Sequence, residues 1–279
     1  MKIFVIPNLE KQDSVPCTNS ALRRLVSLGA VPVLDEKFRA CIANPAGCVF
    51  GRAGELIPDC DVLLAIGGDG TILNTVTANP DKPVIGINTG RVGFLTQLEG
   101  GELDRLDLLV QGRYRIQERM MLEMEVGPPS GMRRWTALND IILSRGYNKI
   151  SELGIYHCGD LIVRHRADGV IFSTPTGSTG YSLSAGGAVV DPSLSAILLT
   201  AICPYSSFNR SLILPPDQVY TVHMEEQGDM SILVDGEMVR RMDAGQDIRI
   251  RQSPKRARLI DLGLRDFYKN LREKLILRR

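Results

Sequence analysis

The sequence predicts an open α/β domain followed by an antiparallel β-rich domain, and three observations support this prediction. The first third of the chain alternates β-branched runs with helix-like segments, which is the pattern of a parallel sheet covered by helices. From about residue 113 the chain changes to β-rich runs with a period of two, broken by Gly, Asp and Pro. The 279 residues are enough for one large domain or two moderate ones.

The predicted elements of the first domain follow one another at short intervals. The run SALRRLVSLG, residues 20–29, has apolar residues at helical spacing and ends at a glycine, so it predicts a helix. The run DVLLAIGG, residues 61–68, is apolar on both faces, which is typical of a strand inside a covered parallel sheet. A second helix is expected over residues 71–78. Further strands are expected over residues 2–7, 31–34 and 83–88.

Three local signals organise the end of the chain. The Asp-Gly pair in LVDGEMV, residues 233–239, predicts a two-residue hairpin turn. The basic run RIRQSPKRAR, residues 249–258, predicts an exposed strand and a turn. Phe267, Leu271 and Leu275 recur at i, i+4 and i+8, which predicts an amphipathic helix.

We therefore expect three segments. An α/β domain should cover residues 1–118 and a β-rich domain residues 119–258. The last segment, residues 259–279, should end in a helix that packs back on the first domain.

The composition excludes several classes of protein. A net charge of +1 gives no electrostatic reason to expect binding to nucleic acid or to a membrane surface, and no apolar run is long enough to span a bilayer. The first residues lack the long apolar core and cleavage site of a signal peptide. The six cysteines form no C-x-x-C pair and the three histidines no H-x-x-x-H spacing, so we expect reduced thiols in a cytoplasmic protein without a protein-only zinc site.

The stretch LLAIGGDGTIL, residues 63–73, carries the first candidate site. A loop that leaves a parallel strand at its carboxyl end opens onto the crevice where α/β sheets bind ligands. Glycines at 67, 68 and 70 allow positive φ and a close approach of backbone N–H groups, and the helix that starts at Thr71 favours an anion at its N-terminus. The loop is therefore suited to cradle phosphate.

Asp69 is the unusual member of this loop, because a carboxylate repels phosphate. A carboxylate that accepts the proton of an attacking hydroxyl is a sufficient chemical contribution to phosphoryl transfer, so we predict that Asp69 is a general base. No G-x-x-x-x-G-K-[ST] motif is present, and Leu73 stands where G-x-G-x-x-G needs its third glycine. The alternative interpretation is a tight turn with a capping aspartate.

A second stretch, DGVIFSTPTGSTGYSLSAGG, covers residues 168–187. Its seven Ser and Thr residues between positions 173 and 184 offer donors to phosphate or ribose. Ser178 is no nucleophile elbow, because Thr176 stands where G-x-S-x-G requires glycine. The alternative interpretation is a Ser/Thr-rich surface turn.

Six segments together resemble the NAD kinase family, in the family's order and over the length of the chain. They are GGDGTIL at 67–73, GINTGRVGFL at 86–95, LNDIIL at 138–143, the stretch at 168–187, CPYSSFNRSLIL at 203–214, and the terminal FYKNLREKL. The resemblance implies that the first domain is Rossmann-like and phosphofructokinase-like. It implies transfer of the terminal phosphoryl group of ATP to the 2′-hydroxyl of the adenosine ribose of NAD, giving NADP.

The resemblance also implies roles for individual residues. Asp69 resembles the general base, Gly70 would approach the dinucleotide through its backbone, and Asn74 stands at a polar contact position. Asn139 and Asp140 match the pair that holds NAD. The remaining binding residues are Arg166 and Asp168, with Asp168 at the nicotinamide end from a neighbouring subunit, and the adenine and ribose loop Thr179, Gly180, Tyr181, Ser182, Leu183 and Ser184.

Two positions depart from the family pattern. Gly180 stands where many members have alanine, and Tyr205 where histidine is frequent. The residues alone leave alternatives open: Asn139 and Asp140 also fit a polar turn before a strand, and Arg166 fits an exposed strand position.

The expected cofactor is a divalent cation, Mg²⁺ or Mn²⁺, whose protein ligands the sequence does not identify. The expected assembly, by resemblance, is a homodimer or homotetramer. Two other functions share these features. A diacylglycerol-type lipid kinase shares the GGDGT turn, and a non-catalytic NAD(P)-binding module would keep both motifs without turnover.

Overall fold

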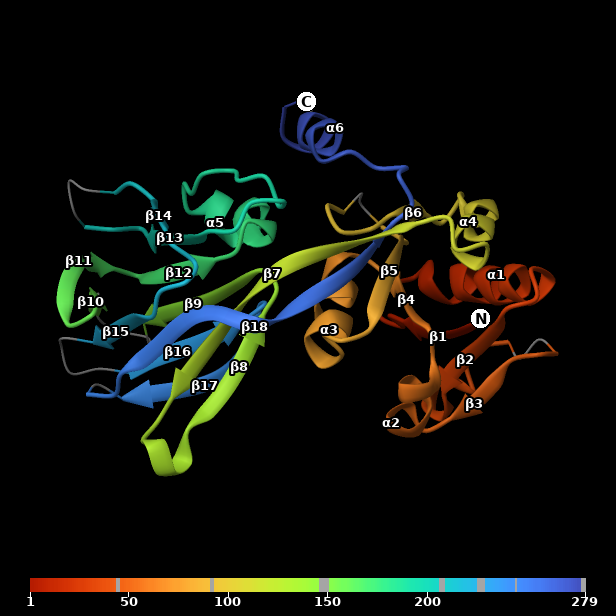
Figure 1. Ribbon diagram of the computed structural model, residues 1–279, viewed down its shortest axis with the longest axis horizontal. Helices are drawn as coiled ribbons and strands as arrows, with labels where there is room; N and C mark the ends of the chain where they lie inside the picture. The colour runs from red at the N-terminus through yellow and green to blue at the C-terminus, as the bar shows by residue number, and fades with distance from the viewer. Residues whose placement is uncertain are drawn as a thin grey trace. The chain divides into compact units, whose positions relative to one another are not determined.

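The computed structural model describes residues 1–43, 46–90, 93–145, 151–205, 209–224, 229–243 and 245–276. The chain forms two compact units, which Figure 1 shows in the colours of the sequence. Unit 1 consists of Met1–Glu118 and Ala257–Arg279, and unit 2 of Arg119–Arg256. The chain passes between the units within two long strands, β7 (Arg115–Val126) and β18 (Ile248–Asp261).

Unit 1 is built on a parallel sheet with the strand order β5-β4-β1-β2-β3. The strands are β1 (Lys2–Pro7), β2 (Val31–Asp35), β3 (Val49–Gly51), β4 (Val62–Gly67) and β5 (Pro83–Asn88). The short β6 (Leu98–Glu99) and the end of β18 pair with β5. Because β1 pairs with β2 on one side and with β4 on the other, the strand order reverses between β1 and β4.

Two helices of unit 1, α1 (Ser14–Ser27) and α4 (Leu106–Val110), bury apolar side chains with the sheet in one core, which includes Leu22, Leu25, Leu64 and Ile66. The helices are α1 (Ser14–Ser27), α2 (Ala53–Leu56), α3 (Asp69–Ala78), α4 (Leu106–Val110) and α6 (Phe267–Leu271), with 3₁₀ turns at Glu36–Phe38, Ile57–Asp59 and Leu103–Arg105 and a π-helical segment at Arg272–Ile276. The predicted strands and both predicted helices are present, but α1 begins six residues before the expected start at residue 20. The sequence pattern did not predict β3, β6, α2 or α4.

The C-terminal helix contacts residues of unit 1. The ring of Phe267 lies 6.3 Å from that of Phe94, and the ammonium of Lys274 lies 3.9 Å from the centre of the Phe94 ring. The regular α-helix is only five residues long, and the side chain of Leu275 lies outside the described residues.

Unit 2 is all-β apart from short helical turns. A six-stranded antiparallel sheet has the order β14-β13-β12-β9-β16-β17, and β11-β10-β15-β18 forms a second antiparallel set. The strands are β8 (Arg133–Ala137), β9 (Asp140–Arg145), β10 (Ser151–His157), β11 (Asp160–Ala167), β12 (Gly169–Ser173), β13 (Ile197–Ile202), β14 (Leu212–Leu214), β15 (Tyr220–Met224), β16 (Asp229–Val234) and β17 (Glu237–Asp243). The helical turns are two 3₁₀ turns, at Pro129–Gly131 and Thr176–Thr179, and the one-turn helix α5 (Tyr181–Ser184). Side chains from both sets share one apolar core.

The hairpin prediction for residues 233–239 is confirmed. Asp235 and Gly236 connect β16 to β17 and have φ values of +49° and +87°. These are the left-handed conformations that a two-residue turn with an Asp-Gly sequence requires.

The prediction of a turn within residues 249–258 is wrong. These residues lie in β18, which continues through Pro254. The β18 pairs with β15 end at Ile250, and the pairs with β5 begin at Arg258. Pro254, which has no N–H donor, stands between these two paired segments, so the strand tolerates it.

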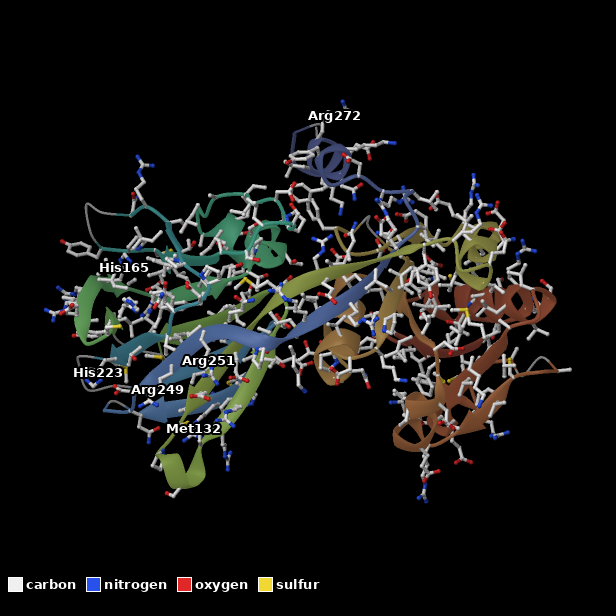
Figure 2. All side chains as sticks on the ribbon, in the orientation of Figure 1. Met132, His165, His223, Arg249, Arg251 and Arg272 are labelled. Atoms are coloured by element: carbon white, nitrogen blue, oxygen red, sulfur yellow. The ribbon has the colours of Figure 1, made fainter. Side chains whose placement is uncertain are left out.

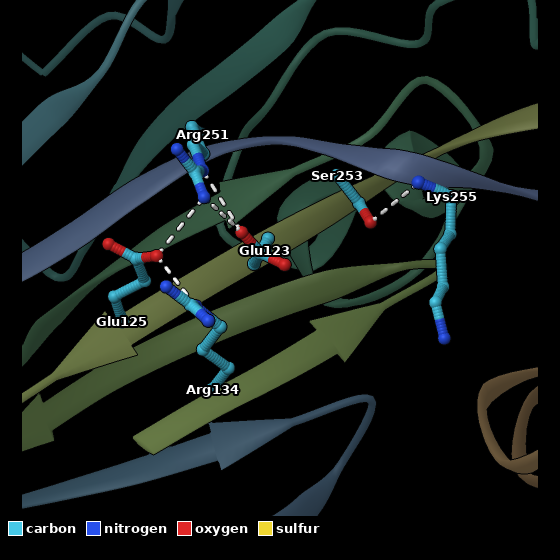
Figure 3. Close-up of polar contacts among 6 residues, drawn as sticks. All are labelled: Glu123, Glu125, Arg134, Arg251, Ser253 and Lys255. Carbon is cyan, nitrogen blue, oxygen red and sulfur yellow. Dashed lines mark hydrogen bonds and ion pairs between the residues drawn. The ribbon is translucent and has the colours of Figure 1, made fainter. Parts of the chain in front are cut away.

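An ion-pair network joins β7, β8 and β18 inside unit 2 (Figure 3). Arg251 lies 2.7 Å from a carboxylate oxygen of Glu123 and 3.1 Å from one of Glu125, and Arg134 lies 2.8 Å from Glu125. The hydrogen bond from Arg134 is the largest factor that lowers the pKa of Glu125. The network satisfies two nearly buried carboxylates.

Candidate active site

The glycine-rich turn joins β4 to α3. A Cβ atom built on Gly67 would lie 2.3 Å from Oγ1 of Thr71, so no side chain fits there. None of Gly67, Gly68 and Gly70 has a φ in the left-handed region, and Gly68 is extended at −176°. The first glycine is therefore needed for close approach and not for the positive φ that the sequence suggested. The surroundings of Gly70 are open, with no atom within 4 Å of a built Cβ.

Asp69 is the first residue of α3, and its carboxylate is held from outside the helix. The backbone N–H of Phe94 donates to Oδ2 at 2.6 Å, and that of Leu95 donates to Oδ1 at 3.0 Å. Its bonds therefore run to a loop 25 residues further along the chain, which differs from the capping turn considered as the alternative. Two amide donors fix the carboxylate and leave lone pairs on both oxygens for another donor.

The contact between Gly93 and Asp69 explains why the motif GINTGRVGFL has a glycine at position 93. A Cβ atom built on Gly93 would lie 1.9 Å from Oδ1 of Asp69, so any other residue would displace the carboxylate. The sequence gave no sign of this contact, because the two residues are distant in the chain. Asn74, the remaining candidate in unit 1, is an exposed residue of α3.

The candidates in unit 2 centre on Asn139 and Asp140, at the start of β9. The carboxylate of Asp235 accepts three backbone N–H bonds from this segment, at 2.8 Å from Leu138, 2.7 Å from Asn139 and 3.1 Å from Asp140. The N–H of Asp235 donates in return to the carbonyl of Asp140 at 3.0 Å. The hairpin turn thus fixes the backbone of the Asn139–Asp140 pair.

The side chains of Asn139 and Asp140 both have oxygen atoms that can still accept hydrogen bonds. The Oδ1 atom of Asn139 is buried and accepts no hydrogen bond from any described residue. Burial raises the pKa of Asp140 to about 7, and the nearby charge of Asp235 adds to the effect. A buried acceptor without a donor is costly, and a ligand that supplies a donor removes that cost.

The Ser/Thr-rich stretch lies against this pair. The N–H of Thr174 donates to the carbonyl of Asn139 at 2.9 Å, and a Cβ atom built on Gly177 would lie 2.1 Å from the same oxygen. A Cβ atom built on Gly180 would lie 3.7 Å from Nδ2 of Asn139 and 3.8 Å from Oδ2 of Asp140. The structure therefore brings the third and fourth motifs together.

Two of the serine side chains form hydrogen bonds to neighbouring residues of unit 2. Ser182 is fully buried and shares a 3.0 Å hydrogen bond with Thr200, and Ser178 donates to the carbonyl of Pro175 at 2.7 Å. The hydroxyls of Ser178 and Ser182 hold the turn together in the free protein, and the binding role expected for Ser182 stays a prediction. The other candidates of the loop, Thr179, Gly180, Tyr181, Leu183 and Ser184, are partly or fully exposed.

Arg166 and Asp168 have partners of their own. The guanidinium of Arg166 lies 5.8 Å from the ring centre of the exposed Tyr205, one of the two departures from the family pattern. Asp168 forms a 2.7 Å ion pair with Arg145, and both side chains are about one third exposed, at 37% and 35%.

The described residues contain no group of three His, Cys, Asp or Glu side chains that could hold a metal ion. His165 and His223, which Figure 2 labels, lie on β11 and β15, and these strands are separated by β10. His223 is paired with Asp247 at 2.9 Å, and burial lowers the pKa of His165. Within the described part of the chain, no helix is long and apolar enough to cross a membrane.

Sequence reasoning missed two contributors to these sites. Asp235 was recognised as a turn residue only, and the amides of Phe94 and Leu95 carry no signal in their side chains. For Asp235 the signal was present, since the carboxylate of an aspartate in a turn can accept hydrogen bonds from backbone N–H groups. No pattern in the neighbouring residues predicted which segment of the chain the Asp235 carboxylate would contact.

Comparisons with known proteins give matches that extend over most of the chain. The family models described as the ATP-NAD kinase N-terminal and C-terminal domains match residues 54–114 and 138–262. An NAD kinase of Caldanaerobacter subterraneus subsp. tengcongensis is 37% identical over 280 residues, covering 98% of each chain. An NAD kinase of Moorella thermoacetica is 38% identical over 279 residues, covering 98% of this chain and 89% of the other.

Two solved structures have the same fold. Yeast NADH kinase complexed with NADH superimposes with a TM-score of 0.87 at 26% identity, covering 99% of this chain and 88% of the other. An NAD kinase from Archaeoglobus fulgidus in complex with ATP superimposes with a TM-score of 0.77, also at 26% identity, and covers 98% of both chains.

Proposed function

The chain belongs to the NAD kinase family, and from that premise we propose that Asp69 is the general base of its phosphoryl transfer. Family membership makes the chain a phosphotransferase with an alcohol group as acceptor. The reaction transfers the terminal phosphoryl group of ATP to the 2′-hydroxyl of the adenosine ribose of NAD, giving NADP and ADP. The observation that carries the proposal is the Asp69 carboxylate, held by two amides beside a glycine-rich turn.

The chemical step needs little covalent help from the protein. The ribose 2′-hydroxyl gives its proton to Asp69 while its oxygen attacks the terminal phosphorus, and the bond from that phosphorus to ADP breaks. A fixed carboxylate holds the attacking oxygen in line and removes the proton. The amides of Phe94 and Leu95 support this role because they set the direction in which the free lone pairs point.

The phosphates of ATP fit the turn before α3. The open backbone at Gly70 and the N-terminus of the ten-residue α3 both favour an anion. We propose that a divalent cation, Mg²⁺ or Mn²⁺, is held mainly by these phosphates and water, as Mg²⁺ is in many phosphoryl-transfer sites. Asn74, further along α3, would be a polar contact for the nucleotide.

The Asn139–Asp140 pair is suited to hold the NAD. The unused Oδ1 of Asn139 can accept a bond from an amino group, while its amide donates. Asp140, desolvated in the free protein, gains most from a partner that donates hydroxyl groups, and a ribose supplies two. The exposed part of the loop from Thr179 to Ser184 would cover the adenine and ribose.

Further parts of the proposal concern the assembly. We propose that Arg166 and Asp168 contact the nicotinamide end, with Asp168 contributed from a neighbouring subunit of a homodimer or homotetramer. The exposed Tyr205 ring beside Arg166 supports this assignment, since an exposed aromatic is suited to an interface. We further propose a cytoplasmic location.

The test is a direct assay. Purified protein is incubated with NAD, ATP and Mg²⁺, and NADP is measured with an NADP-specific dehydrogenase. We expect NADP to accumulate and diacylglycerol to remain unphosphorylated under the same conditions. NAD binding without turnover would instead identify a non-catalytic binding module, and phosphorylation of diacylglycerol would identify a lipid kinase.

A further inference from the structure

The loop after β1 lies at the point where the strand order of unit 1 reverses. In open α/β sheets this point, outside the carboxyl ends of the strands, is where ligands bind. The N–H of Asn8 donates to the carbonyl of Ile66 at 2.8 Å, and its side-chain amide donates to Oγ1 of Thr71 at 3.3 Å. The loop after β1 is therefore bonded to both sides of the glycine-rich turn.

Lys11 belongs to this loop, and both its backbone N–H and its backbone carbonyl are hydrogen-bonded. Its N–H donates to the carbonyl of Asn8 at 3.2 Å, and its carbonyl accepts from the N–H of Ser14 at 3.0 Å. Ser14 in turn donates from its hydroxyl to the carbonyl of Ile66 at 3.2 Å. The starting point of the Lys11 side chain is thus set by the end of β4.

The ammonium group of Lys11 lies against two glycines of the family motifs. A Cβ atom built on Gly68 would lie 3.3 Å from Nζ, and one built on Gly90 would lie 3.5 Å from it. Gly68 directly precedes Asp69, and Gly90 belongs to the loop that leads to the Asp69-binding amides. The positive charge therefore stands beside the turn assigned to the phosphates.

This charge is uncompensated within the described part of the chain. None of the ion pairs there involves Lys11, and the residue is exposed. Two other lysines of unit 1 differ from it. Lys82 donates to the carbonyls of Pro58 and Cys60 at 2.7 Å and 2.8 Å, and Lys37 lies over the ring of Phe38.

We propose that Lys11 binds the terminal phosphates of the donor and positions the phosphoryl group over the Gly68–Asp69 turn, an inference that rests on the proposed function. Asp69 repels the donor's phosphates, and a lysine on the neighbouring loop beside that turn offsets the repulsion. A lysine ammonium acts on phosphate as a compact point charge with three donors. Phosphoryl transfer is catalysed mainly by such positioning and charge stabilisation.

The test uses the full-length protein and compares Lys11→Met, Lys11→Arg and the control Lys37→Met. We expect Lys11→Met to lower kcat/KM for ATP by about 10- to 100-fold, the value of a hydrogen bond to a charged group. The KM for NAD should stay within about twofold. Lys11→Arg should recover most of the loss because it restores the charge, and Lys37→Met should behave as the wild type.

A binding measurement separates this inference from the proposed function. Calorimetry with the non-hydrolysable β,γ-imido analogue of ATP and Mg²⁺ should show about tenfold weaker binding to Lys11→Met.

Unchanged analogue binding and unchanged kcat/KM for ATP would overturn the role of Lys11, even if the wild type forms NADP. An equal loss for NAD would also overturn it, because the charge would then serve the acceptor. A wild type that binds the analogue and forms no NADP overturns the proposed function alone. Should Lys11→Met not fold, Lys11→Gln carries the same comparison.

Discussion

The turn around Asp69 in unit 1 and the Asn139–Asp140 segment in unit 2 each contain an aspartate, and the surroundings of the two carboxylates differ. Asp69 accepts two backbone N–H bonds, and Asp235 accepts three. Asp140 is buried, lies near the charge of Asp235, and has a pKa raised to about 7. Amide donors fix the direction of a carboxylate, whereas a buried carboxylate without such donors is stabilised by a ligand that brings them. The difference separates a carboxylate that is held in one orientation from one that is open to the hydroxyl groups of a ligand.

The largest expected effect is on the chemistry at Asp69. Asp69→Asn removes the base and should lower kcat by about 10²- to 10⁴-fold, because that is the usual contribution of a general base. The KM for NAD should change little, since the amide keeps the shape of the side chain. Steady-state kinetics with both substrates measure this. Asp59→Asn, at an exposed acid of the same unit, is the control, and full activity of Asp69→Asn would remove Asp69 from its role.

The second effect tests whether the orientation of Asp69 matters. Gly93→Ala places a Cβ atom where Oδ1 of Asp69 now lies, 1.9 Å from the built position, so the carboxylate must move. A misplacement of about 1 Å costs about 100-fold in rate. We expect that loss in kcat with an intact fold by circular dichroism. Gly101→Ala, which meets no atom within 4 Å, should keep wild-type kinetics.

The third effect concerns the stability of unit 2. Asp235→Ala removes the acceptor of three N–H groups and should lower the free energy of unfolding by about 2 kcal/mol, the cost of losing hydrogen bonds to a charged group. The KM for NAD should rise as well, because the Asn139–Asp140 backbone loses its support. Urea unfolding and kinetics measure the two effects. Asp160→Ala, at an exposed aspartate that starts β11, is the control, and equal stability of the two variants would contradict the role given to Asp235.

The last effect, which is gradual and spread over several pH units, is the pH dependence of stability due to Asp140. Its pKa is raised in the folded state, so the folded protein binds more protons than the unfolded chain between pH values of about 4 and 7. This contribution to stability is full below the unfolded pKa and is lost as the pH rises through the folded pKa. In that range the free energy of unfolding should fall by up to about 1.4 kcal/mol per pH unit.

The check is urea unfolding of unliganded wild type and Asp140→Asn across this pH range. The variant should lack the decline, because asparagine does not titrate. Parallel curves for the two proteins would show that Asp140 titrates normally in the folded state.

Local features were predictable from the sequence because they depend on neighbours in the chain. The apolar run that ends in Gly67 predicts β4, and the Asp-Gly pair at 235 predicts the hairpin. The basic run failed as a prediction because Pro254 suggested a turn. Pairing with β15 before it and with β5 after it keeps the strand extended.

The candidate sites show the same difference between features that a local motif predicts and contacts that depend on distant residues. The motifs marked Asp69, Asn139 and Asp140 by resemblance, and the comparisons confirm the family to which the resemblance pointed. The resemblance also marked Ser182, which the structure turns inward to Thr200. A motif preserves the residue type and says nothing of whether a side chain faces a ligand or its own turn.

The sequence by itself determined the order of strands and helices, the two motif-bearing turns and the family, because each is written in contiguous residues. Only the tertiary structure decided that the amides of Phe94 and Leu95 hold Asp69, that Asp235 supports Asn139, and that Lys11 lies beside Gly68. Those contacts join residues 25 to 96 positions apart. Their partners are chosen by the pairing of strands, which no local pattern encodes.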